Sequence, residues 1–326
     1  MSGPLEQMDP APAPSRLRVP REMAGLRADA YLFCELPALS RRRVRQKIQM
    51  GESLLNGRRY STATRLRAGD EISVTWRGVP QRGPCPDLEI LFEDAHLLAV
   101  NKPAGVASHQ VGRHQSGTVV QFARLRFEAE IRESLARGDA SFYPTLVNRL
   151  DVFTSGIVLV AKTRPVHRAM QALVARRLIV REYIALVEGW MGDEEGLIEV
   201  PIGPDPASAV RVKMACRNDG RRSSTRYQVL ERLPGHTLVR VRPLTGRQHQ
   251  IRVHFAALGH PVAGDLLYKD EALFLAGGTS PQRHCLHARR AIFTHPVSGT
   301  EVEIEAQVPE DFQMVVNRIR AEGFLG

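Results

Sequence analysis

The chain has 326 residues, of which 43% are hydrophobic, and this composition predicts a packed soluble protein with one large and one small domain. Its formal net charge of +10 at pH 7 indicates a polyanionic partner, although charge alone does not separate RNA from DNA or from an acidic surface. The four cysteines lie far apart without a Cys-x-x-Cys pair, which argues against a zinc ribbon, a disulfide framework and a redox motif.

Residues 1–18 predict a flexible tail, because they hold a Pro-Ala-Pro-Ala-Pro run and lack the apolar core of a signal peptide. No later stretch is long and apolar enough to cross a bilayer. We therefore expect a cytoplasmic protein that makes no membrane contact, and we expect a monomer.

Residues 26–78 predict a small unit of two helices and a hairpin. The first helix covers residues 28–33, and Ser40 caps a second helix that runs to residue 49. A strand turns at Asn56-Gly57 and a second strand covers residues 70–76. On the second helix the apolar residues share one face and the arginines another. The cations that we expect to contact RNA in this unit are Arg41, Arg42, Arg45, Lys47 and Arg58.

This order of elements resembles the alpha-L RNA-binding domain, also called the S-four-type domain. The likeness rests on Arg27-x-Asp29-x-x-Leu32, Leu39-Ser40-Arg41, Gly51, Asn56-Gly57 and Gly69-Asp70. It implies an RNA-binding domain over residues 19–78, followed by a linker rich in Pro and Gly at 79–87. A solvated basic face without a partner is the alternative interpretation.

Residues 88–326 predict one strand-rich α+β domain. The expected helices cover residues 118–137 and 164–177, and residues 201–225 predict a long basic loop or hairpin. The expected strands cover residues 88–92, 97–100, 156–161, 183–187, 226–231, 237–242, 248–254 and 301–305, with another from 291.

Two runs in this domain carry the chemistry. The first, residues 148–157, places Asp151 at a Thr-Ser-Gly turn that leads into an apolar strand. The second run, residues 244–254, holds several basic and amide side chains. Its alternation of apolar and polar residues predicts one extended segment. A lone Asp before Thr-Ser is ordinarily a turn or capping residue, so only the two runs together indicate a carboxylate nucleophile in a cationic cleft.

The first run resembles the His-Arg-Leu-Asp-x-x-Thr-Ser-Gly signature of the RluA-like pseudouridine synthases, here Asn148-Arg149-Leu150-Asp151-x-x-Thr154-Ser155-Gly156. Residues 244–268 are similar to a later motif of that family, and further matches lie at 93–105, 182–189 and 225–231. The likeness therefore covers nearly the whole chain in family order. It implies a mixed, mostly antiparallel sheet with flanking helices.

The resemblance also implies the reaction, which is isomerisation of uridine to pseudouridine in RNA without metal or cofactor. The substrate would be ribosomal RNA, with transfer RNA as the other class. Asp151 would act as nucleophile or as the base that deprotonates the ribose, and Arg252 would pair with it and keep it ionised. Tyr183 would lie against the uracil and help to remove the C5 proton. Arg149 would fill the space left by the flipped uridine.

The family likeness further implies RNA contacts at Lys102, Asn148, Arg247 and His249. Position 148 departs from the pattern, because the family usually carries His there. Asn can still form hydrogen bonds but cannot become cationic, so a charged phosphate contact would be lost. This departure leaves open a second hypothesis, a catalytically impaired RNA-binding or ribosome-assembly protein. The histidines show no metal-binding spacing, so we expect no metal site.

Overall fold

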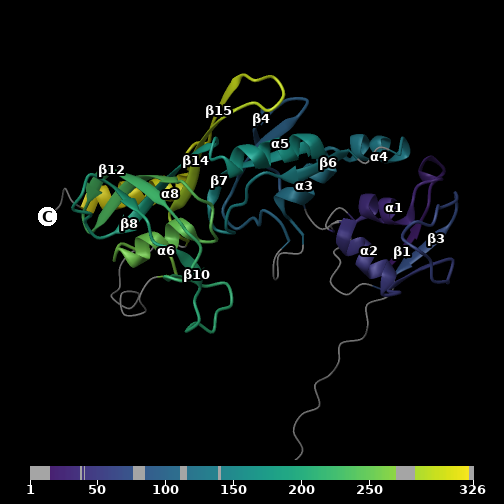
Figure 1. Ribbon diagram of the computed structural model, residues 1–326, viewed down its shortest axis with the longest axis horizontal. Helices are drawn as coiled ribbons and strands as arrows, with labels where there is room; N and C mark the ends of the chain where they lie inside the picture. The colour runs from purple at the N-terminus through teal and green to yellow at the C-terminus, as the bar shows by residue number, and fades with distance from the viewer. Residues whose placement is uncertain are drawn as a thin grey trace, which may run out of the picture. The chain divides into compact units, whose positions relative to one another are not determined.

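The computed structural model describes residues 15–36, 39, 41–75, 85–110, 116–138, 141–268 and 283–322. Its contacts divide the chain into two compact units, which are described one at a time. Unit 1 comprises Met1–Pro86 with His109–Pro144, and unit 2 comprises Asp87–Ser108 with Thr145–Gly326. Figure 1 labels the elements of both units. In the described part of the chain, no helix has the length and hydrophobicity needed to span a membrane.

Unit 1 contains an antiparallel sheet in the order β1 (Ser15–Arg18), β3 (Glu71–Val74), β2 (Ser53–Leu55). The short 3-10 helix η1 (Arg21–Met23) precedes α1 (Ala28–Glu35) and α2 (Arg41–Gln49). Seven of the eight residues of α1 are buried, and its aromatic and aliphatic side chains pack against Val44, Ile48 and Ile72. The order of elements is the expected one, although Ser40 lies outside the described residues.

The flexible tail expected over residues 1–18 does not include its last four residues. Residues 15–18 were expected to belong to it, but they form β1, in which Leu17 stands opposite Ile72 of β3. They are ordered because they pair with the free edge of β3 and because Leu17 packs against the core of unit 1.

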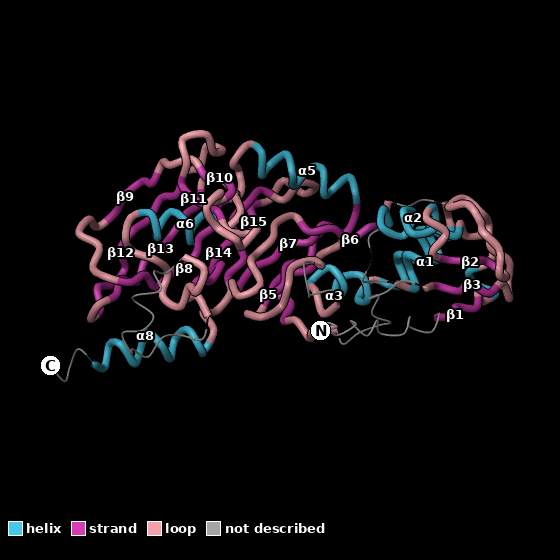
Figure 2. The backbone as a smooth tube through the Cα atoms, turned by 90° about the horizontal axis from the view of Figure 1, so that it is seen from below, coloured by secondary structure: helices cyan, strands magenta, loops and turns pink. Residues whose placement is uncertain are grey.

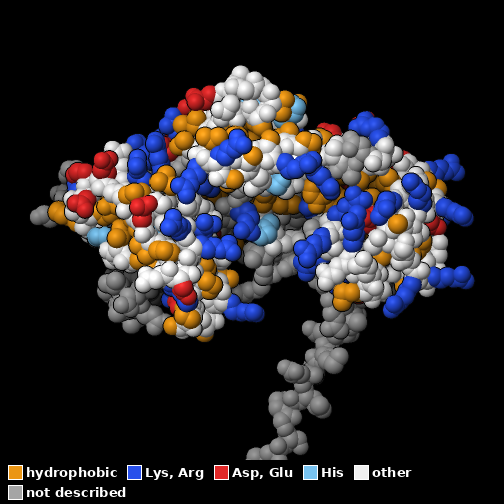
Figure 3. Space-filling model, viewed as in Figure 1, with side chains coloured by type: hydrophobic (Ala, Val, Ile, Leu, Met, Phe, Trp, Pro, Cys, Tyr) orange, Lys and Arg blue, Asp and Glu red, His pale blue; other side chains and the backbone are white. Residues whose placement is uncertain are grey.

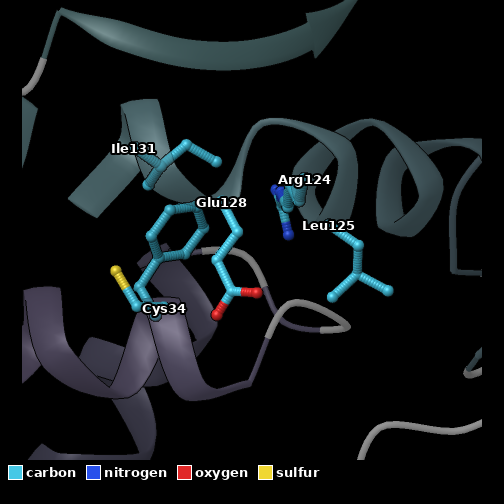
Figure 4. Close-up of a pocket in the computed structure, with 6 residues that line it drawn as sticks. Cys34, Arg124, Leu125, Glu128 and Ile131 are labelled. Carbon is cyan, nitrogen blue, oxygen red and sulfur yellow. The ribbon is translucent and has the colours of Figure 1, made fainter. Parts of the chain in front are cut away.

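Two helices from the middle of the chain also belong to unit 1. The single helix expected at 118–137 is divided at Phe127 into α3 (Val119–Arg126) and α4 (Glu128–Ala136). Ile131 joins the core of α1 and α2, and Arg124 Nη1 donates to Leu39 O at 2.7 Å. Figure 4 shows Arg124 and Glu128 around a small pocket beside Cys34 of α1. Contacts therefore group 109–144 with the N-terminal unit, whereas the sequence placed 88–326 in one domain.

Unit 2 is built on a ten-stranded sheet. Its strand order is β4 (Glu89–Glu93), β5 (Leu97–Lys102), β7 (Ser155–Thr163), β14 (Leu286–Thr294), β8 (Val180–Glu188), β13 (His236–Pro243), β12 (Thr225–Leu233) and β9 (Glu195–Ile198). In addition, β15 (Glu301–Glu305) pairs with β14, and β6 (Phe142–Leu146) pairs with β7. From β4 to β9 along this order, and between β14 and β15, neighbouring strands are antiparallel except for β7 and β14, which run parallel. The expected mixed, mostly antiparallel α+β fold is confirmed.

Helices cover parts of this sheet (Figure 2). Thr163 caps α5 (Arg164–Ala175), whose Met170 packs against Leu159 of β7. A further helix, α8 (Glu310–Glu322), was not expected from the sequence and packs Phe312 and Ile319 against β8. The basic segment expected as a loop or hairpin contains a hairpin, β10 (Ile202–Pro204) with β11 (Met214–Cys216).

The strand expected at 248–254 is wrong, because the structure has a helix there, α6 (Gln250–Ala257). Apolar and polar residues alternate along this segment, but Gln250–Phe255 are all buried, so the alternation does not separate a buried face from an exposed one. His249 adopts a left-handed conformation with φ of 54° just before the helix. The Gln250 side chain accepts a hydrogen bond from Arg247 N at 3.0 Å and closes the turn that precedes the helix.

Candidate active site

Asp151 begins a tight turn that leads into β7. Thr154 N donates to Asp151 O at 3.1 Å, and Ser155 and Gly156 are the first residues of the strand. Gly156 has φ of +111°, and a Cβ at this position would stand 2.2 Å from Ala288 O of β14. Only glycine therefore permits the parallel pairing of β7 and β14 behind Asp151.

Two buried histidines of unit 2 anchor this turn. His284 Nε2 lies 2.8 Å from Thr154 Oγ1, and His287 Nδ1 lies 2.9 Å from Ser155 Oγ. Burial lowers the pKa of His284 to about 3 and the pKa of His287 to about 4. Both rings are therefore neutral at pH 7 and serve as hydrogen-bond partners of the two hydroxyls. Sequence reasoning had assigned them no role.

Arg252 of α6 connects Asp151 to a second carboxylate. Its Nη1 donates to Asp151 Oδ2 at 2.9 Å, while Nε and Nη2 donate to Asp265 at 2.6 and 2.8 Å. Although burial lowers the pKa of Arg252, the hydrogen bonds to Asp265 and Asp151 raise it overall. The Asp265 side chain is fully buried, whereas that of Asp151 is 28% exposed, so Asp151 is the carboxylate that a substrate can reach.

Tyr183 and His249 are the other predicted residues close to this pair. Burial raises the pKa of Tyr183, the Arg181 charge lowers it, and the Asp151 charge raises it. His249 Nε2 lies 3.9 Å from Asp151 Oδ1, and its Nδ1 lies 2.7 Å from the hydroxyl of Tyr268. Burial lowers the pKa of His249, so its ring is neutral at pH 7.

Lys102 does not suit the RNA contact expected of it. The residue is fully buried, and its ammonium donates to the carbonyls of Pro103, Val106 and Val152 at 3.0, 2.7 and 3.0 Å. Burial lowers its pKa to about 7. Because Val152 follows Asp151, Lys102 binds the backbone of the turn that begins at Asp151.

Asn148 likewise points into the protein. Its Nδ2 donates to Ile157 O at 3.1 Å and its Oδ1 accepts from Leu159 N at 2.7 Å. The side-chain amide thus pairs with β7 as a backbone amide would. These two bonds use one N–H and one lone pair of the amide, and the RNA contact expected of Asn148 stays a prediction.

The remaining predicted cations lie at the surface or near it. Arg149 is exposed, and Arg247 Nε donates to Arg222 O at 3.2 Å. Phe153, two residues after Asp151, is 51% exposed, which is unusual for a phenylalanine. Lys and Arg side chains are widespread on the face of the molecule shown in Figure 3.

In unit 1, buried Asp29 organises the expected basic surface. It accepts from Arg27, Arg41 and Arg45 at 3.0, 3.3 and 2.5 Å. Lys47 pairs with Glu52. The last two cations expected here, Arg42 and Arg58, are exposed.

Known proteins similar to this chain identify its family. The family model described as RNA pseudouridylate synthase matches residues 96–257. The ribosomal large subunit pseudouridine synthase D of Xanthomonas campestris pv. campestris is 35% identical over 325 residues, with 95% of each chain covered. The ribosomal large subunit pseudouridine synthase C of Escherichia coli is 32% identical over 323 residues, covering 95% of this chain and 98% of that one.

A solved structure of a human protein also matches the fold of this chain. The human RNA pseudouridylate synthase domain containing 1 has a TM-score of 0.54 and 25% identity, and the match covers 73% of this chain and 97% of that chain. With an accessible Asp151 paired to Arg252 in the matched region, the chain belongs to the RNA pseudouridylate synthase family and is an RNA-modifying isomerase.

Proposed function

We propose that this enzyme isomerises uridine in large-subunit ribosomal RNA, with Asp151 as the carboxylate that acts on the ribose of the target nucleotide. The 2.9 Å ion pair between Arg252 Nη1 and Asp151 Oδ2 carries the proposal, since it favours an ionised carboxylate that remains partly exposed. The names of the two bacterial relatives support the choice of large-subunit RNA over transfer RNA.

The reaction needs a negative group beside the ribose. The bond between ribose C1′ and uracil N1 breaks, the uracil turns, and C1′ bonds to C5, which loses its proton while N1 gains one. Asp151 contributes as a nucleophile at C1′ or as the base that removes a ribose proton, and either role requires the ionised form. Asp265 accepts hydrogen bonds from Nε and Nη2 of Arg252. Asp151 Oδ2 accepts one from Nη1, and Asp151 Oδ1 accepts none from Arg252.

Other residues around Asp151 would receive the flipped nucleotide. Tyr183 would pack against the uracil and assist removal of the C5 proton, and His249 would contact the ribose or base. Arg149 and Phe153 lie on the exposed side of the turn. A guanidinium and an aromatic ring there would stack on bases next to the vacated position.

Unit 1 would add phosphate contacts through its basic residues. We assign residues 19–78 to an S-four-type RNA-binding domain and propose Arg42 and Arg58 as its exposed phosphate ligands. Arg41 and Arg45 are held by Asp29 and would present their remaining N–H groups. The enzyme would work as a cytoplasmic monomer. The hypothesis of an impaired enzyme rested on Asn148, whose side chain is used to pair with β7, so we do not adopt it.

Pseudouridine mapping tests the proposal. Total RNA from the source organism is compared with RNA from a strain lacking this gene and from that strain expressing the Asp151→Asn variant. We expect one or more pseudouridines of large-subunit ribosomal RNA to disappear in both and to return with the wild-type gene. Asp193→Asn changes an exposed acid and is the matched control, which should restore every site. Loss of transfer RNA sites alone would contradict the substrate assignment.

A further inference from the structure

Arg181 is a cation of unit 2 to which neither the sequence motifs nor the proposed chemistry gives a role. It lies on β8, two residues before Tyr183, and alternation along a strand places both side chains on the same face of the sheet. Glu182 between them points the other way, where Arg242 and Arg290 neutralise it. Arg181 therefore shares its face of the strand with a residue of the candidate active site.

The guanidinium of Arg181 has no counterion among the described residues. Its Nε is buried and has no hydrogen-bond partner there, and no salt bridge to the group is found in that part of the chain. A buried donor without a partner destabilises a fold, and proteins retain few of them. Such a group is expected where a ligand completes the hydrogen bonding and neutralises the charge.

The surroundings place this cation beside the reacting groups. Both terminal nitrogens stand 3.7 Å from the point where a Cβ of Gly246 would lie, in the segment that joins β13 to α6. That segment leads directly to His249 and Arg252. The Arg181 charge also lowers the pKa of Tyr183, against the larger effect of burial. Arg181 and Asp151 thus both act electrostatically on Tyr183.

Three other arginines of unit 2 are already paired with carboxylates. Arg252 is held by Asp265 and Asp151, Arg242 by Glu182, and Arg283 by Asp311. A planar guanidinium favours two parallel hydrogen bonds to a phosphate, and phosphate is the anion that RNA offers.

On these contacts, and on the proposed action on RNA, we propose that Arg181 binds a backbone phosphate adjoining the target uridine and so positions the flipped nucleotide between Asp151 and Tyr183. Arg181 is then a substrate-binding residue and takes no part in bond making or breaking. Replacing Arg181 should weaken RNA binding more than it slows uridine isomerisation at saturating RNA.

The salt dependence of binding tests this assignment. The full-length chain and its Arg181→Gln and Arg181→Lys variants are titrated with an oligonucleotide carrying a mapped target uridine, at several salt concentrations. Losing one phosphate contact should raise Kd about tenfold or more and reduce the slope of log affinity against log salt by about 0.7–0.9. Arg181→Lys should keep the slope and lose part of the affinity. Arg168→Gln, an exposed arginine of α5, is the matched control and should match wild type.

A neutral phosphate identifies the contact. The same oligonucleotide is made with a methylphosphonate on the 5′ or the 3′ side of the target uridine. If the methylphosphonate replaces the phosphate that Arg181 binds, wild type and Arg181→Gln should have equal Kd for that RNA. Neither protein can then make the charged contact. An undiminished difference on both modified RNAs, or a wild-type salt slope for Arg181→Gln, would overturn the inference. Failure of the proposed function looks different, since wild type itself would then form no pseudouridine in the unmodified oligonucleotide.

Discussion

Mild acid should destabilise the protein through buried His287, which contacts Ser155 at the end of the turn that begins at Asp151. His287 is fully buried, and its ring nitrogens lie 2.9 Å from Ser155 Oγ and 3.2 Å from Ala306 O. Burial lowers its pKa to about 4, against about 6.5 in the unfolded chain. Because the folded pKa is the lower one, the unfolded chain binds the extra proton, and stability is lost as pH falls from 6.5 towards 4.

The size of the effect follows from this pKa difference. At pH 5 this histidine is protonated in the unfolded chain and neutral in the folded protein. Because pH 5 lies 1.5 units below the unfolded pKa of about 6.5, the free energy of unfolding falls by about 2 kcal/mol. In His287→Gln this contribution is absent. Urea denaturation at pH 7 and pH 5 measures the loss, and the difference between the two pH values cancels any constant effect of the substitution itself.

We expect wild type to lose about 2 kcal/mol more than His287→Gln between pH 7 and pH 5. His236→Gln, at the partly exposed first residue of β13, controls for the substitution and should show the wild-type loss. Equal losses in wild type and His287→Gln would refute the reasoning, because His287 would then bind its proton equally well in the folded protein.

Three further substitutions test the packing around the site. Gly156→Ala should lower stability by more than about 3 kcal/mol, because its Cβ would overlap Ala288 O, whereas Gly192→Ala has open space and should stay within about 0.5 kcal/mol in the same urea titration. Asn148→His introduces the residue usual in the family, but histidine cannot make both hydrogen bonds to β7. We therefore expect the free energy of unfolding to fall by about 1–3 kcal/mol and turnover not to increase. Faster turnover would contradict the role given to Asn148. Asp265→Asn frees Arg252 to bind Asp151 with two N–H groups, so pseudouridine formation should fall at least about tenfold at saturating RNA, and an unchanged rate would show that Asp265 does not position Arg252.

Local sequence identified the residues whose role depends on a short motif. The run around Asp151 predicted the turn and its strand, and the later run supplied Arg252, which the structure places 2.9 Å from Asp151. The later run was nevertheless assigned the wrong secondary structure. Burial on all sides of α6 removes the one-sided pattern by which a helix is distinguished from a strand.

Residues that act through distant partners could not be predicted. His287 meets Ser155 across 132 positions of the chain, and nothing in either neighbourhood indicates the pair. The family resemblance implied RNA contacts at Lys102 and Asn148, but in the fold both side chains form hydrogen bonds to backbone groups. Polarity predicts a hydrogen bond, and only the fold decides whether its partner is RNA or the protein. No sequence pattern indicates Arg181, because its distinguishing feature is a buried Nε without a partner among the described residues.

The most direct test of the account is pseudouridine formation by the purified Asp151→Asn variant. The substrate is large-subunit ribosomal RNA from a strain that lacks the gene, and binding of the same RNA is measured in parallel. We predict no detectable product together with RNA affinity close to that of wild type, because Asn keeps the size of Asp but loses the negative charge. Product formation at the wild-type rate would contradict the assignment of Asp151 as the catalytic carboxylate.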